Sequence, residues 1–149
     1  MALGIPVIED ISQSAGASVP VKNAEGLPTE ERKLAGSFGI YTILGLEERD
    51  VLTAGGGAVL MAPGRREWIV LKKYSDEAPL TDLLPDINCA LAWVQVKEFT
   101  KCDGAVALRS PAIALKYALQ ALDFEKGGKI MISALAPAWQ YQTVVSLGF

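Results

Sequence analysis

The 149-residue chain contains no histidine and only two cysteines, Cys89 and Cys102. Without an imidazole, nucleophilic catalysis by Ser-His or Cys-His pairs is excluded, as is acid–base chemistry by histidine. The two cysteines lie too far apart for a CxxC motif, and no histidine is present to complete a zinc set. The sequence therefore predicts no metal centre, and it predicts reduced thiols in a cytoplasmic setting.

Excess basic charge and long apolar runs are also missing. The net charge is −3, and the only adjacent basic residues are the short pairs Arg65-Arg66 and Lys72-Lys73. Such a distribution gives nucleic acid or an anionic membrane no surface to bind. No apolar run approaches the roughly 20 residues of a membrane span, and the N-terminal residues lack the basic region of a signal peptide. We expect a soluble protein.

What the chain does contain is the composition of one packed domain, with 50% hydrophobic and 21% charged residues. Short apolar and β-branched runs predict strands, and three-four apolar spacing predicts helices. The expected strands are Ile5–Ile8, Phe38–Leu44, Gly57–Met61, Ala105–Leu108 and Ile130–Ile132, and the expected helices are Arg65–Ser75, Pro85–Phe99, one from Pro111 to about Gly127, and Trp139–Leu147. This alternation predicts an α/β fold whose sheet has about five mostly parallel strands flanked by helices.

Two stretches carry further expectations. The run Ile5–Ile8 ends at two acids, as does a parallel strand that is buried on both faces and has its functional residues at its carboxyl end. The polar stretch from Ser18 to Ala35 reads as a surface excursion, in which Pro28–Lys33 could form one short helix. Trp139 is expected to serve packing rather than a cofactor.

Three motifs occur in a fixed order over the first hundred residues. They are Ile5-Pro-Val-Ile-Glu-Asp10-Ile-Ser-Gln13-Ser-Ala-Gly-Ala17, Gly36-Ser-Phe-Gly39 and Thr53-Ala-Gly-Gly-Gly57, followed by the helix-like stretch from Leu84 to Gln95. Together they resemble the DegT/DnrJ/StrS family of pyridoxal-phosphate (PLP) dependent sugar aminotransferases, whose large domain has the fold-type-I architecture. Residues 1–101 resemble the middle and late part of that domain. Residues 102–149 resemble its beginning, placed after the rest, and we expect one packed unit.

The resemblance implies roles for individual residues. Asp10 matches the carboxylate that keeps the PLP ring nitrogen protonated, and Gln13 matches the residue that contacts the phenolic oxygen of the ring. Ser110 matches the start of the phosphate-binding helix terminus. The implied cofactor is PLP, and the implied ancestral reaction is amino transfer to a keto sugar nucleotide.

The covalent half of this site is missing. The position of the Schiff-base lysine falls on Arg49 or on Asp50, depending on which motif sets the alignment, and neither side chain can form the imine. The phosphate-binding Ser-Gly-Thr of the family becomes Ser110-Pro111-Ala112, which loses a backbone donor and a hydroxyl. We therefore expect no catalytic residue, and a fragment or degenerate relative that does not transaminate alone.

A non-catalytic interaction or dimerisation module that keeps the aminotransferase fold is the alternative. It implies a homodimer or pairing with an active paralogue. The resemblance also implies that the strands Ala105–Leu108, Gly57–Met61, Phe38–Leu44 and Ile5–Ile8 are neighbours in that order. The family has one further strand between Ile5–Ile8 and Ile130–Ile132, and this chain lacks it. We expect Ile130–Ile132 either to pair with Ile5–Ile8 or to leave an open sheet edge.

Overall fold

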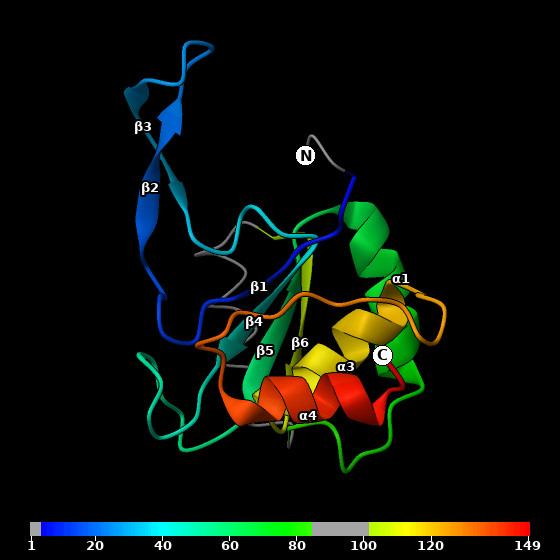
Figure 1. Cartoon of the computed structure of the whole chain (residues 1–149). Coiled ribbons are helices and arrows are strands. Elements are labelled where there is room, and N and C mark those ends of the chain that lie inside the picture. Colours follow the sequence, from blue (N-terminus) through cyan, green and yellow to red (C-terminus); the bar gives the residue numbers. More distant parts are fainter. Residues whose placement is uncertain (1–3, 85–101) are drawn as a thin grey trace.

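A four-stranded sheet with the order β1-β4-β5-β6 organises the chain (Figure 1). The computed structural model describes residues 4–84 and 102–149. The strands of this sheet are β1 (Ile8–Asp10), β4 (Tyr41–Gly45), β5 (Ala58–Ala62) and β6 (Gly104–Leu108). The predicted order of neighbouring strands is thereby confirmed.

The prediction of a mostly parallel sheet of about five strands is wrong. Only β1 and β4 pair in parallel, whereas the β4–β5 and β5–β6 ladders are antiparallel. Residues 46–57 connect β4 to β5 without a helix. Because parallel neighbours need a crossover connection, usually a helix, this loop returns the chain antiparallel. As a result β1, β4 and β6 point one way and β5 points the other.

Several individual elements also differ from expectation. Residues 130–132 form no strand, and the N-terminal strand covers Ile8–Asp10 instead of Ile5–Ile8, with Ile8 only half-buried. The segment predicted as a short helix is strand β3 (Pro28–Leu34). It pairs antiparallel with β2 (Ser18–Lys22). The predicted helix Pro85–Phe99 lies outside the described residues.

Three described helices form where helices were predicted, although the one that begins at Pro111 ends at Ala121 and not near Gly127. They are α1 (Arg65–Asp76), α3 (Pro111–Ala121) and α4 (Ala138–Ser146). The Ser110 hydroxyl caps α3 by accepting from the Ile113 backbone N–H, and Pro111 occupies the first turn, where its missing N–H costs nothing. Over residues 4–84 and 102–149, none of the helices combines the length and apolarity that crossing a bilayer demands.

The core lies on both faces of the sheet. On one face Tyr41, Ile43, Leu60 and Leu108 pack with α1, α3 and α4, and on the other Leu44, Val59 and Met61 pack with Ile11. This alternation follows from the two-residue period of a strand, and it explains why every residue of β4, β5 and β6 is buried. At Gly104 a side chain would run into the ring of Trp68 on α1, so helix and sheet pack closely there because the residue is glycine.

The pair β2 and β3 forms an arm that projects from the body (Figure 1). All seven residues of β3 are exposed, so the prediction of a surface excursion is confirmed. The arm is fixed locally by side chains: Thr29 Oγ1 donates to the Val21 carbonyl at 2.8 Å, and Arg32 donates to Ser18 Oγ and to the Ser18 carbonyl.

Candidate functional site

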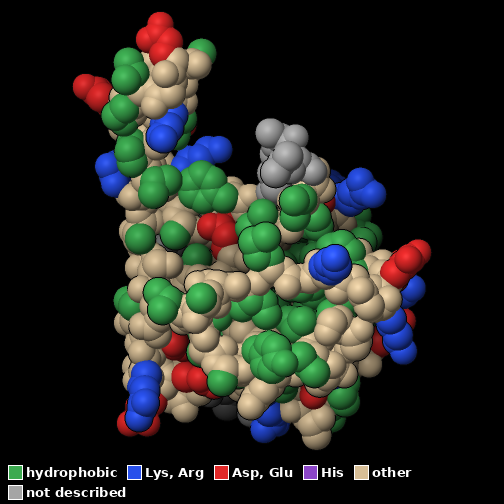
Figure 2. All heavy atoms as spheres, viewed as in Figure 1, with side chains coloured by type: hydrophobic (Ala, Val, Ile, Leu, Met, Phe, Trp, Pro, Cys, Tyr) green, Lys and Arg blue, Asp and Glu red, His purple; other side chains and the backbone are tan. Residues whose placement is uncertain are grey.

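A cavity of about 1180 Å³ lies beside β1 and opens onto one face of the molecule. Its walls come from β1 and the residues before it, the loop at residues 47–50, one side of α3, the segment 129–137 and α4. Figure 2 shows apolar side chains gathered around the hollow on this face. Because β1, β4 and β6 point the same way, Asp10, the loop after β4 and the start of α3 meet at one edge, where the cavity begins.

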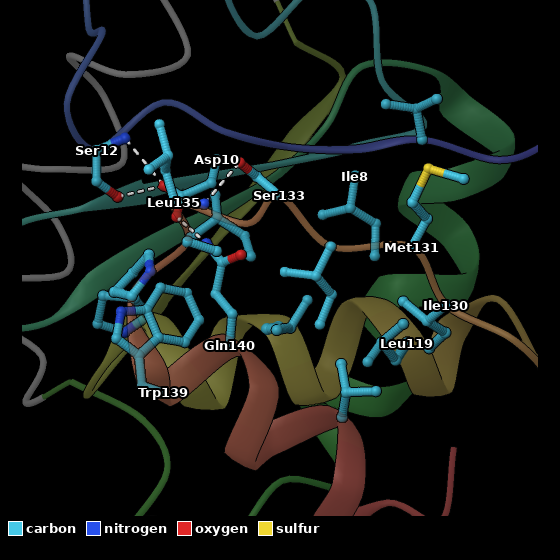
Figure 3. Close-up of a pocket in the computed structure, with 18 of the residues that line it drawn as sticks. Ile8, Asp10, Ser12, Leu119, Ile130, Met131, Ser133, Leu135, Trp139 and Gln140 are labelled. Atoms are coloured by element: carbon cyan, nitrogen blue, oxygen red, sulfur yellow. Dashed lines mark hydrogen bonds between the residues drawn. The ribbon is translucent and has the colours of Figure 1, made fainter.

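Asp10 stands at the carboxyl end of β1 and is held by three donors. Its Oδ1 accepts from the Ser12 backbone N–H at 3.0 Å and from Ser12 Oγ at 2.6 Å, and its Oδ2 accepts from Gln140 Nε2 at 2.7 Å. Ser12 is buried, and its Oγ also accepts from the Gly45 backbone N–H at 2.8 Å. The carboxylate is therefore anchored to β4 through Ser12 and to α4 through Gln140. Figure 3 shows the contacts of Asp10 with Ser12 and Gln140.

Gln13 lies against the loop that holds the predicted lysine position. Its Nε2 donates to the Arg49 carbonyl at 3.1 Å and to Asp50 Oδ1 at 3.0 Å. Asp50 Oδ2 in turn accepts from the Glu47 backbone N–H at 2.8 Å. The structure thus brings Asp10, Gln13, Arg49 and Asp50 to one end of the cavity. The carboxylate of Asp50 thus accepts two hydrogen bonds in the loop where the resemblance predicts a lysine.

Ser110 is not among the residues that line the cavity, although its neighbour Pro111 is. The Ser110 hydroxyl caps α3 by accepting from the Ile113 N–H at 3.3 Å. An anion at this helix terminus would find no N–H on Pro111 and no hydroxyl on Ala112. The predicted role of Ser110 as a cofactor contact stays a prediction, and its described contact is a helix cap.

Sequence reasoning missed Ser12 and Gln140, and it assigned Trp139 to packing alone. Trp139 is half-buried, packs against the core and also lines the cavity. Figure 3 shows its ring at the Asp10 end, away from Ile130 and Met131. Gln140 lies 130 positions from Asp10, and no local pattern links the two residues.

The residues present fit only the ring half of PLP. Asp10 supplies a carboxylate for a protonated ring nitrogen, and Trp139 supplies an aromatic face beside it. Among the described residues that line the cavity, the only lysine is Lys129. Figure 3 shows Ser133 near Asp10. Lys129 precedes Ser133 by four residues, or roughly 13 Å of extended chain, so its backbone lies far from the Asp10 end. The described residues therefore provide neither a Schiff-base amine at Asp10 nor a phosphate cup.

Within the part of the chain that the structure describes, no three acidic, cysteine or histidine side chains gather into a group that could hold a metal ion. Cys102 is buried as a free thiol. Comparisons of the chain with protein-family models, with curated proteins and with solved structures gave no match.

Proposed function

We propose that this chain is a non-catalytic relative of the sugar aminotransferases that binds a planar, protonated heteroaromatic ring between Asp10 and Trp139, without a covalent bond. The pyridinium ring of pyridoxal phosphate is the model ligand. Amino transfer to a keto sugar nucleotide is then an ancestral reaction that this chain does not perform alone. A reducing, cytoplasmic setting belongs to the proposal, because Cys102 is buried as a free thiol.

The observation that carries the proposal is the contrast between Asp10 and Asp50. Asp10 keeps a carboxylate at the cavity, exposed enough to meet a ligand. Asp50 is half-buried, and its two oxygens accept from Gln13 and from the Glu47 backbone N–H. Both oxygens of Asp10 also accept hydrogen bonds within the protein, but Oδ2 accepts only one, from the exposed contact with Gln140. The exposed Asp10 carboxylate can therefore still meet a ligand, and the position that needs an amine is occupied by a structural carboxylate.

Binding should depend on the ring and little on the phosphate. We expect isothermal calorimetry to detect reversible binding of pyridoxine, which has neither aldehyde nor phosphate, with pyridoxine 5′-phosphate binding within a few-fold of it. Asp10→Asn should weaken binding by about tenfold or more, because a hydrogen bond to a charged group contributes roughly 1.5–3 kcal/mol. The matched control is Asp76→Asn, which changes an exposed carboxylate on α1.

Two results would overturn the proposal. Equal heats for the parent and for Asp10→Asn would remove the ring contact. Pyridoxal phosphate that survives dialysis and becomes fixed to a single lysine by borohydride would remove the non-catalytic assignment. A separate observation favours the alternative function as an interaction module: β1 lies at the end of the four-stranded sheet, and no other described strand pairs with its outer side.

A further inference from the structure

The far wall of the cavity is a segment that has the side-chain pattern of a strand but no strand partner. We call residues 129–133 the strap. Exposure alternates along it: Lys129, Met131 and Ser133 are exposed, whereas Ile130 and Ile132 are half-buried. Among the described residues, no backbone hydrogen bond reaches residues 129–132. In Figure 1 the strap crosses in front of the sheet on its way to α4.

The near wall is a sheet edge. β1 pairs with β4 on one side, where the Val7 carbonyl accepts from Ile40 N–H and Ile11 N–H donates to the Ile43 carbonyl. Backbone groups alternate in direction along a strand, so those of Ile8 and Asp10 point to the opposite side. No described strand pairs with that side. Of the two expected outcomes, the described residues show the second, an open edge at β1. Unpaired edges favour pairing with another chain.

The space between these walls matches a strand in size. One strand residue occupies about 160 Å³, taking roughly 3.3 Å along the strand, 4.8 Å between strands and 10 Å between layers. The cavity of about 1180 Å³ has room for a five-residue strand and exceeds the range of ordinary small-molecule sites. Its apolar lining includes Ile5, Val7 and Ile8 on one side, Ile130 and Ile132 on the other, and Leu119 of α3.

We propose that two copies of this chain form a dimer by strap exchange, in which each copy inserts its strap into the cavity of the other. The strap of each copy lies in the cavity of the other, next to the partner's β1. The resulting order across the junction is β1, partner strap, own strap, partner β1. This order satisfies both copies at once, because each strap lies between its partner's β1 and its partner's strap.

The exchange is closed and symmetric. A two-fold axis between the two straps pairs them antiparallel and joins the two four-stranded sheets into one, so that β1 and both edges of each strap are paired. A second copy is the favoured occupant because the strap itself offers the unpaired backbone and the alternating apolar side chains that the cavity requires. The exchange also places Met131, which is 99% exposed in the single chain, beside its symmetry mate.

Strap exchange predicts a dimer that one backbone substitution weakens. Met131→Pro removes a backbone donor in the middle of the strap and fixes φ, and it alters a fully exposed side chain. We expect light scattering of the whole chain to show a dimer, and Met131→Pro to raise its dissociation constant at least about tenfold. The control is Leu80→Pro, since Leu80 is 84% exposed and lies in a turn that proline suits.

A second variant tests the two-fold axis. In Met131→Cys, residue 131 lies next to its symmetry mate, and paired strand residues have the Cα separation that a disulfide needs. Mild oxidation should give a dimer in which mass spectrometry finds residue 131 linked to itself, whereas Leu80→Cys should not link. A parent chain that stays monomeric at every concentration would overturn the exchange, as would a dimer unchanged by Met131→Pro.

Discussion

Gln140 Nε2 lies 2.7 Å from Asp10 Oδ2, and this hydrogen bond joins the first turn of α4 to the end of β1 across 130 positions of sequence. It fixes the Gln140 side chain, which follows Trp139 in the sequence and lines the same cavity. It also uses one oxygen of the carboxylate that we propose to bind a ring. Helix α4 and the candidate site are therefore coupled through a single contact.

Gln140→Leu tests this coupling. A hydrogen bond to a charged group contributes up to roughly 1.5–3 kcal/mol when shielded, but both side chains are solvent-accessible here. We therefore expect Gln140→Leu to lower the free energy of unfolding by about 1 kcal/mol in urea titrations. In a double-mutant cycle, Asp10→Asn and Gln140→Leu should couple by at least about 0.5 kcal/mol. Additive effects would show that the contact contributes nothing to stability.

Glu9 provides a second prediction, because its carboxylate holds the turn that leads into β4. Its Oε1 accepts from the Gly36 N–H at 3.0 Å, and its Oε2 accepts from the N–H groups of Phe38 and Gly39 at 2.7 and 2.6 Å. Glu9→Ala leaves three backbone donors without their acceptor. We expect a loss of about 2–3 kcal/mol in the free energy of unfolding.

The matched control for Glu9 is Glu25→Ala, at the tip of the exposed arm. This substitution should change the free energy of unfolding by less than about 0.5 kcal/mol. Equal losses in Glu9→Ala and Glu25→Ala would contradict the role of Glu9 in the turn. Glu9→Gln should recover part of the loss, because the amide oxygen can still accept from one of the donors.

The sequence was a better guide to which residues lie together at the cavity than to the directions of the strands. Asp10, Gln13 and the loop at Arg49-Asp50 meet as expected, because each follows a strand and β1 and β4 pair in parallel. The direction of β5 was not predictable from periodicity, since an apolar run reads the same in either direction. Gln140 and Trp139 reach the site only through the packing of α4 on α3, which no local pattern encodes.

The charged segment of β3 is a case in which the sequence did not predict even the type of secondary structure. Pro28-Thr-Glu-Glu-Arg-Lys suits a first helical turn as well as a strand, and no apolar period distinguishes the two. The strand forms because β2 lies alongside it, with Arg32 bound to Ser18 and Thr29 bound to Val21. Pairing with β2 therefore determined that this segment is a strand, because its intrinsic propensity did not distinguish strand from helix.

Tyr117 provides a prediction about alkaline pH. Burial, the hydrogen bond that its hydroxyl donates to Asp82 Oδ2 at 3.0 Å, and the charge of Asp82 raise the pKa of Tyr117 from 10.0 to about 12. Between pH 10 and pH 12 the folded phenol keeps a proton that the unfolded chain has released. The unfolded state then binds fewer protons, so the free energy of unfolding falls as pH rises through this window. Burial similarly raises the pKa of Tyr41 to about 12, so both phenols contribute.

Tyr117→Phe separates the two contributions. Below pH 10 the variant should lose about 1 kcal/mol, because the hydrogen bond to Asp82 is gone. Between pH 10 and pH 12 its stability should fall less steeply than that of the parent, since only Tyr41 remains to titrate late. Urea titrations at several pH values measure both effects, and Tyr141→Phe is the control because Tyr141 is 66% exposed. If the slope of Tyr117→Phe equals that of the parent, the Tyr117 hydroxyl does not hold its proton in the folded state.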